Sequence, residues 1–273
     1  METVQNLKNK GGRFFRLYKV FFAQFIKRLV EYRADFLTGC FGFIAGQVFN
    51  ILFIFILFEN ISQLAGWNLN QIMFIYGFSQ IPRGIDHFFT DDLWKVAHFT
   101  VRKGEFDKYL TRPVDTLHQV LMEGFQPDAL GEFLTGVILL VYASIQLKVQ
   151  ITFTWILLLI VAVIGGTFIY TGVKIVFASF AFKMKRSGNL LFVAYMTSDF
   201  ARYPVTIYNE FIKTTVSYIF PFAFTAYFPA SYLLTGNSPL FCIGGAVVMG
   251  LFWMILGRIS WNYWLTKYES AGS

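Results

Sequence analysis

Charged residues are scarce in this 273-residue sequence, where only 14% are Asp, Glu, Lys or Arg. A soluble domain usually has about 25%. Hydrophobic residues instead make up 56% of the chain, and phenylalanine alone contributes 34 residues. A chain of this composition cannot cover its surface with polar groups. The composition therefore argues against an ordinary water-soluble protein and favours lipid as the solvent.

Residue types that bind metals or act as nucleophiles are also scarce. The two cysteines, Cys40 and Cys242, lie far apart in apolar runs, which is typical of small buried side chains rather than of a disulfide or a metal pair. The three histidines, His87, His98 and His118, lack the spacing of a metal motif. No arrangement of a nucleophile with a base is visible. We therefore expect no metal site and no enzymatic activity in this chain.

A phosphate-binding loop is missing as well. No Gly-x-x-x-x-Gly-Lys-Ser/Thr sequence occurs, although this loop cradles ATP phosphates in P-loop proteins. The nearest glycine-rich stretch, Gly165-Gly166-Thr167, lies inside an apolar run, where it favours close packing between helices. No secretory signal peptide is evident, because the first long apolar stretch follows a basic segment. We expect no cofactor in this chain, so an ATP-driven motor would have to be another chain.

Apolar runs predict about six helical spans. About 20 helical residues cross a hydrocarbon core of roughly 30 Å. Five runs are long enough, and they cover residues 37–58, 69–90, 128–147, 155–182 and 239–260. The second run carries several polar and charged residues, so we expect it to pack against protein. Pro204, Pro221 and Pro229 interrupt residues 190–238, for which we expect one broken span and then a re-entrant or interfacial segment on the outer side.

Lysine and arginine are concentrated in alternate loops. Residues 1–36 hold eight of them, residues 91–127 five and residues 183–189 three, whereas the loop 59–68 has none. The positive-inside rule then places both termini in the cytoplasm. We expect a multi-pass protein of the cell membrane, with a bacterial plasma membrane as its location. These loops also account for the net charge of +7, so nucleic acid is not an expected partner.

The N-terminal segment differs from the spans. Residues 13–36 combine basic and aromatic residues at helical spacing, and neither Pro nor Gly interrupts them. Such an amphipathic helix is expected to lie in the membrane interface. We therefore divide the chain into a cytoplasmic N-terminus with this interface helix (1–36), a six-span domain (37–260) that contains a long polar segment (91–127), and a cytoplasmic tail (261–273).

Ionisable residues within the predicted spans are arranged as three pairs with a spacing of three residues. The pairs are Arg83 with Asp86, Asp199 with Arg202, and Glu210 with Lys213. Each pair can neutralise itself on one helix face. We interpret them as structural pairs, with a gate or a substrate contact as the alternative. Lys174, near the cytoplasmic end of the fourth span, can snorkel towards the interface.

Residues 101–121 alternate charged and aromatic side chains. Pro113 would suit the first turn of a short helix there. From this pattern alone, a segment that docks a soluble partner and a solvated connector both remain open.

A family resemblance begins in this segment. The stretch Gly104-Glu105-Phe106-Asp107-x-x-Leu110-x-Arg112-Pro113 resembles a signature of the type-2 ATP-binding-cassette (ABC) exporter permeases, in the daunorubicin-resistance-like branch. The resemblance continues at Glu31-Tyr32-Arg33-x-x-Phe36-Leu37, at Ala201-Arg202-Tyr203-Pro204, at Ile219-Phe220-Pro221-Phe222-Ala223-Phe224 and at Tyr227-x-Pro229-Ala230. These matches fall in order over about residues 30–235.

The resemblance implies an all-α membrane permease with six spans. It also implies an N-terminal interface helix that includes Glu31, Tyr32 and Arg33, a coupling helix between spans two and three, and a broken outer segment between spans five and six. Two nucleotide-binding subunits would carry ATP and Mg, and a second permease, identical or homologous, would complete the exporter. The substrate is not readable from the sequence, although the aromatic content is compatible with an amphipathic one.

The resemblance also implies which residues contact the ATPase. They are Gly104, Glu105, Phe106, Asp107, Leu110, Arg112 and Pro113. We expect Phe106 to be the aromatic anchor of that contact. Arg112 would pair with a carboxylate of the partner, or with Glu31 of the interface helix. The rival hypothesis is an ion-coupled secondary transporter, which would be expected to show internal repeats and midplane charges.

Overall fold

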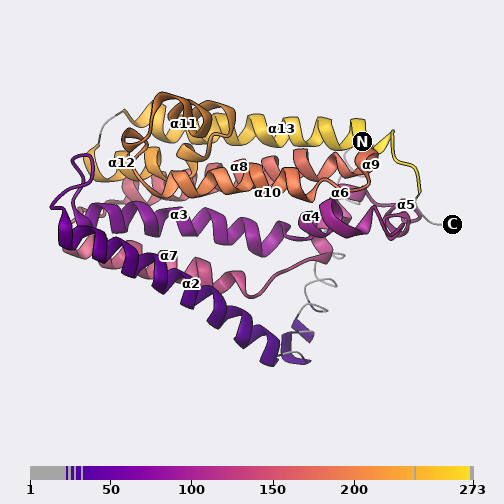
Figure 1. Cartoon of the computed structure of the whole chain (residues 1–273), viewed down its shortest axis with the longest axis horizontal. Coiled ribbons are helices and arrows are strands. Elements are labelled where there is room, and N and C mark those ends of the chain that lie inside the picture. Colours follow the sequence, from indigo (N-terminus) through magenta and orange to yellow (C-terminus); the bar gives the residue numbers. More distant parts are fainter. Residues whose placement is uncertain (1–22, 24–25, 28, 32, 237, 271–273) are drawn as a thin grey trace, which may run out of the picture.

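The computed structural model covers the whole chain, and the residues described here are 23, 26–27, 29–31, 33–236 and 238–270. In this part of the chain the regular elements are helices, and only an isolated bridge between Leu64 and Trp67 has β geometry. The long helices lie side by side along the longest axis, with short helices at both ends (Figure 1).

Among the described residues, four helices are long and apolar enough to cross a membrane. They are α2 (Arg33–Asn60), α7 (Ala129–Gln146), α8 (Phe153–Ser179) and α13 (Gly245–Leu265). Each overlaps one of the predicted spans, so those four predictions are confirmed. The six-span arrangement stays a prediction.

Helix α3 (Leu69–Thr90) has the bounds of the predicted second span, but it is not among the four apolar helices. It begins at a capping box, in which the Asn68 side chain accepts from the Gln71 backbone N–H at 3.0 Å and the Gln71 side chain accepts from the Asn68 N–H at 2.9 Å. Most of its residues are buried, against α7 and α8 in particular. As expected from its polar residues, this helix is surrounded by protein.

Helices α8 and α13 approach each other closely because glycines lie at their contact. A Cβ atom at Gly172 would lie 2.5 Å from the backbone carbonyl carbon of Trp253, and one at Gly165 would lie 2.8 Å from the backbone of Ala246. The interpretation of Gly165-Gly166-Thr167 as a packing site is thereby confirmed. Small residues at such contacts let helix backbones pack without intervening side chains.

Residues 188–244 form a series of short helical pieces. In chain order these are α10 (Gly188–Met196), 3-10 helices at Thr197–Arg202 and Val205–Ile207, α11 (Glu210–Thr214), a π-helical turn at Thr215–Ile219, a 3-10 helix at Phe222–Thr225, and α12 (Tyr227–Thr235), before Leu240–Gly244 leads into α13. Pro204 and Pro221 each stand directly before one of the 3-10 helices. The nine residues of α10 span only about 14 Å. The described chain is therefore interrupted several times between 188 and 244, and the broken span with a re-entrant segment stays a prediction.

The opposite end of the bundle carries α4 (Asp92–Lys95), α5 (Asp107–Leu110), α6 (Thr116–Glu123) and α9 (Ala181–Met184) (Figure 1). Residues Val96–Thr100 continue helically after α4. The chain then turns at Gly104, whose φ of +73° is readily adopted only by glycine. The polar segment 91–127 is therefore folded onto the end of the bundle.

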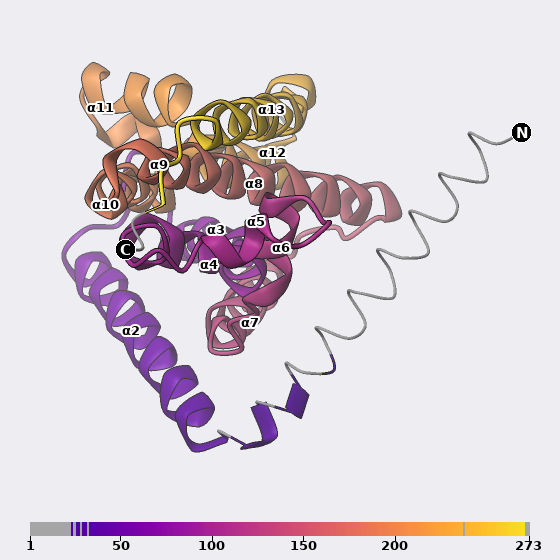
Figure 2. The ribbon, with the colours of Figure 1, turned by 90° about the vertical axis from the view of Figure 1, so that its right-hand side faces the viewer.

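The described part of α2 starts at Arg33, before the predicted span 37–58. It packs mainly on α7 and to a lesser extent on α3, and its N-terminal part stands apart from the other helices (Figure 2). The predicted interface helix, residues 13–36, lies for the most part outside the described residues. Tyr32 is among those left out, and Glu31 and Arg33 are exposed.

Candidate functional site

Phe106 fixes the polar segment to the body of the protein. Its side chain is 0% exposed. Its ring centroid lies 4.7 Å from that of Phe182 in α9, 5.3 Å from that of Tyr268 and 6.1 Å from that of Trp261 in α13. This burial corrects the expectation that Phe106 inserts into a partner, because the ring already fills a site within its own chain.

Asp107 connects the same segment to the C-terminal tail. Its carboxylate accepts hydrogen bonds from the Tyr268 hydroxyl at 2.8 Å and from the Ser270 hydroxyl at 2.6 Å. The bonds from Ser270 and Tyr268 lower the pKa of Asp107. Burial, together with the bond to Asp107, raises the pKa of Tyr268 to about 12. Residues of the predicted tail therefore belong to the folded end of the bundle.

Asp115 joins helix α6 to α13. Its side chain caps α6 by accepting from the His118 backbone N–H at 3.1 Å, so this helix begins at Thr116 and Pro113 lies outside its first turn. Arg258 donates to both carboxylate oxygens of Asp115, at 2.8 and 2.6 Å. Burial by itself would raise the pKa of Asp115, but the hydrogen bonds from Arg258 and His118 hold it below its ordinary value.

A second bond between the same two helices lies beside this pair. The indole Nε1 of Trp261, a fully buried side chain, donates to the Thr116 hydroxyl at 3.0 Å. The sequence did not indicate Asp115, Thr116, Arg258 or Trp261 as site residues, because each contact joins positions more than 140 apart in the chain.

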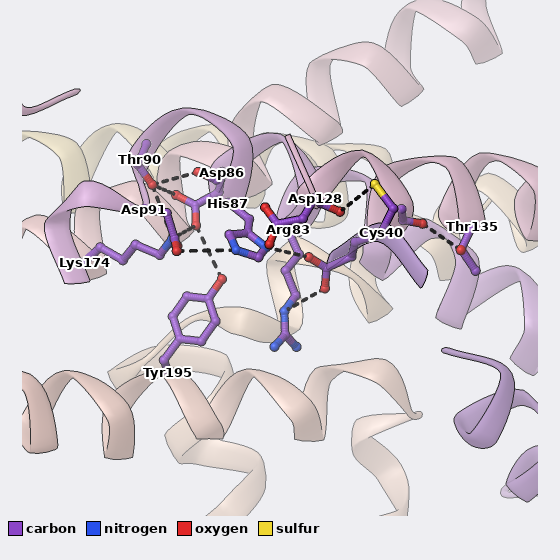
Figure 3. A network of polar contacts seen from close by, with 12 residues as sticks. Cys40, Arg83, Asp86, His87, Thr90, Asp91, Asp128, Thr135, Lys174 and Tyr195 are labelled. Carbon is purple, nitrogen blue, oxygen red and sulfur yellow. Dashed lines mark hydrogen bonds and ion pairs between the residues drawn. The ribbon is translucent and has the colours of Figure 1, made fainter. Parts of the chain in front are cut away.

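A network of charged residues occupies the second half of α3 (Figure 3). Arg83 contacts Glu132 of α7 through Nε at 3.1 Å and Asp199 through Nη1 at 2.8 Å. Arg202 shares the same Asp199 oxygen at 2.7 Å. The predicted pairing of Asp199 with Arg202 is thereby confirmed. The predicted pairing of Arg83 with Asp86 is wrong, because Arg83 reaches across to two other segments.

Asp86 instead pairs with Lys174 of α8. The distance between Lys174 Nζ and Asp86 Oδ2 is 2.8 Å, and both side chains are 0% exposed. Lys174 also contacts Asp91 at 3.0 Å, and Asp86 accepts from the hydroxyls of Thr90 and Thr171. The expectation that Lys174 snorkels is therefore wrong: its charge is matched inside the bundle, as buried charges require.

His87 lies between two carboxylates of this network. Its Nδ1 is 3.4 Å from Glu132 Oε2, and its Nε2 is 3.4 Å from Asp91 Oδ2 (Figure 3). The third predicted pair, Glu210 with Lys213, is also confirmed, at 3.2 Å. That pair lies on the surface, where an ion pair contributes little to stability.

Metal and disulfide chemistry is not supported by the arrangement. Among the described residues, no group of three or more His, Cys, Asp or Glu side chains could hold a metal ion. Cys40 and Cys242 are both free. In the part of the chain that the structure describes, the charged side chains of the network contact one another and thereby tie α3 to α7, α8 and the turn at 197–202.

Comparison with known protein families decides the family. The model of the family described as "ABC-2 family transporter protein" matches residues 44–272, which is well over half of the chain. The chain belongs to the ABC-2 transporter family. No curated protein and no solved structure matched it in the corresponding searches.

An ABC-2 chain is the membrane permease component of an ABC transporter, and such a component works with an ATP-binding subunit. The permease is therefore a multi-pass membrane protein and a transport subunit. Because the chain belongs to this family, the rival hypothesis of an ion-coupled secondary transporter is set aside. The daunorubicin-resistance-like branch is a finer assignment and stays a prediction.

The ABC-2 permease presents one side of the polar segment to solvent. Its exposed residues are Arg102, Lys103, Glu105, Lys108, Leu110, Thr111, Arg112 and Pro113. Arg112 contacts Glu123 at 2.8 Å rather than Glu31, and Glu123 also accepts from Lys108 at 3.0 Å. Leu110, 48% exposed, is the large apolar side chain of this face. Of the predicted contact residues, Phe106 is thus turned inward, Gly104 makes the turn, and Asp107 is held by the tail.

Proposed function

We propose that this permease belongs to an exporter that moves an amphipathic substrate out of the cytoplasm or the inner leaflet. Two nucleotide-binding subunits, which carry ATP and Mg, would drive it, and a second permease, identical or homologous, would complete the transporter. The observation that supports this proposal is the exposed face of residues 102–113. On its inner side, Phe106 packs against the buried side chains of Phe182 and Trp261.

The exposed face has the composition of a docking surface. Leu110 and Pro113 supply apolar area, and the basic residues around them supply a polar rim. Protein interfaces commonly combine an apolar centre with such a rim. The face is also pre-organised, because Phe106 and Tyr109 on its inner side are buried. We propose that this face is the coupling surface for the ATPase.

The contacts behind the face would transmit its movement. Phe106 packs on Phe182 in α9, the short helix that follows α8, and Asp115 is held by Arg258 in α13. Helices α8 and α13 are themselves in backbone contact at Gly172. A force applied to residues 102–113 would therefore move both helices together rather than bend a flexible loop.

The orientation of the permease is part of this proposal. The basic segments 91–127 and 183–189 lie at one end of the bundle, which we propose to be cytoplasmic. Asn68 precedes α3 at the other end (Figure 1). In intact cells, a cysteine introduced by Asn68→Cys should react with an impermeant thiol reagent, whereas one introduced by Thr111→Cys should not. Labelling of both would contradict the orientation.

Charge and shape changes on the exposed face test the coupling surface. Leu110→Asp and Arg112→Glu should reduce co-purification of the ATPase and abolish transport, while the amount of folded permease in the membrane stays normal. The matched control is Glu210→Ala, an exposed residue of α11, a helix that lies towards the other end of the bundle (Figure 1). It should leave assembly unchanged. Full assembly and transport in both face variants would show that the ATPase docks elsewhere.

A further inference from the structure

A groove of about 350 Å³ lies between α2 and the charged network. Its α2 wall consists largely of glycines and amides: Gly39, Gly42, Gly46, Gln47 and Asn50. Its opposite wall includes Arg83, Glu132 and Arg202. A Cβ atom at Gly42 or Gly46 would meet no atom within 4 Å. The missing side chains on this face of α2 therefore leave open space beside two guanidinium groups.

Hydrogen-bond donors are in excess on the walls of this groove. Gln47 is 6% exposed, and its carbonyl oxygen accepts from the Tyr76 hydroxyl. Within the described part of the chain, the Gln47 side-chain nitrogen has no acceptor. Arg83 and Arg202 likewise keep N–H groups for which no described residue is an acceptor. The terminal nitrogens of Arg83 point away from His87 and Asp86 (Figure 3).

The carboxylate of the same walls, that of Glu132, is already in use. Both Glu132 oxygens are engaged, one by Arg83 and the other by His87. One Asp199 oxygen lies between Arg83 and Arg202, at 2.8 and 2.7 Å, and thereby shows how an anion can be held between the two guanidinium groups. A ligand that satisfies the remaining donors must itself be an acceptor. Bonds from guanidinium to an oxyanion are the strongest bonds of this kind.

A second cavity of about 330 Å³ continues from the groove. The two cavities share Phe43, Arg83 and Glu132 in their walls. The second adds His87 and Asp91, which contact each other, and apolar side chains of α10, among them Phe192 and Met196, which are 53% and 40% exposed. A charged end in the groove could therefore be followed by an apolar chain along α10.

We propose that the groove binds the anionic headgroup of a single amphiphile, whose apolar chain lies in the second cavity. This assignment deepens the proposed export function, on which it rests for naming the substrate class. Because Arg83 and Arg202 are balanced by Glu132 and Asp199, the groove attracts a small free anion only weakly. The apolar chain supplies the remaining affinity through burial.

Binding to the purified full-length permease in a neutral detergent tests the site without any ATPase. The probe is radiolabelled hexadecyl phosphate, and the competitors are phosphatidylglycerol, hexadecanol and inorganic phosphate. We expect saturable binding that phosphatidylglycerol displaces and that neither hexadecanol nor inorganic phosphate displaces. Displacement by hexadecanol would show that the site recognises only an apolar chain. Displacement by inorganic phosphate would show that it recognises only a free anion. Either result overturns the proposal.

Variants of residues in the groove provide a second test of the proposal. Gly42→Leu and Gly46→Leu place apolar side chains in the open space, where a Cβ atom at either position meets no atom within 4 Å, and Arg202→Gln removes a charged donor. Each should weaken binding about tenfold or more: the leucines because they occupy the space of the headgroup, and Arg202→Gln because it removes a bond to a charged group. The control is Val48→Phe, on an exposed part of α2, which should bind normally.

Unchanged binding in Gly42→Leu and Gly46→Leu would overturn the proposal. If these variants bind normally but have a lower oligomeric mass, the glycine face of α2 contacts a second copy of the permease. That result would overturn the proposal as well. These outcomes are separate from those of the coupling experiment, because a permease can lose its ATPase and still bind the amphiphile.

Discussion

Replacement of Phe106 by alanine should destabilise the permease itself, before any partner is present. The ring is fully buried and contacts Phe182, Tyr268 and Trp261 at centroid distances of 4.7, 5.3 and 6.1 Å. Truncation of a buried Phe to Ala costs about 3–5 kcal/mol. For a chain of this size, a cost near the lower limit corresponds to a fall of about 6–12 °C in melting temperature.

The assay is the melting temperature of the detergent-purified chain, followed by loss of the monodisperse peak in size-exclusion chromatography. Phe99→Ala is the matched control, since Phe99 lies in the same segment and is 49% exposed. It should change the free energy of unfolding by no more than about 0.5 kcal/mol. Phe106→Leu should lie between the two. Equal melting temperatures for Phe106→Ala and Phe99→Ala would refute the argument that Phe106 anchors the segment internally.

Three further predictions concern the remaining contacts. Lys174→Met leaves the Asp86 carboxylate buried without its cation and should lower the free energy of unfolding by about 3–5 kcal/mol, measured as a loss of folded protein. The double variant Lys174→Met with Asp86→Asn should recover part of the folded protein. No recovery would contradict a direct pair. Gly172→Ala places a Cβ 2.5 Å from the backbone of α13 and should lower the melting temperature, whereas Gly42→Ala, which meets no atom within 4 Å, should not. The pKa of Asp115 is held below its ordinary value. The stabilising contribution of its carboxylate is therefore complete above about pH 4 and is lost as the pH falls through the folded-state pKa. Asp115→Asn should make the melting temperature depend less on pH in the acid range, and an unchanged pH dependence would contradict the pairing of Asp115 with Arg258.

The long apolar elements were predictable from local sequence. Hydrophobic runs indicated the four apolar helices, and the same reasoning gave the bounds of α3. Pro204, Pro221 and Pro229 predicted a broken segment: short helices begin directly after the first two, whereas Pro229 lies in the first turn of α12. Such features depend on neighbouring residues, because helix length, proline geometry and apolar composition are properties of a short stretch of chain.

The partners of charged and aromatic side chains were much less predictable. Spacing along one helix correctly paired Asp199 with Arg202. It also paired Arg83 with Asp86, but in the structure Arg83 contacts Glu132 and Asp86 contacts Lys174. The pattern of residues 101–121 likewise marked Phe106 as important without showing whether it faces inward or outward. One sequence contains no signal for a contact between positions 45 to 145 residues apart, such as Glu132 with His87 or Thr116 with Trp261.

The sequence by itself thus determined that the chain is a helical membrane protein, and its motif order pointed to the ABC permeases that the family comparison then supported. The tertiary structure alone decided which side of the polar segment is free for a partner. It also decided where the buried charges are neutralised and which glycines leave a groove open. Composition and periodicity act within one helix, whereas burial and charge pairing depend on which helices pack together.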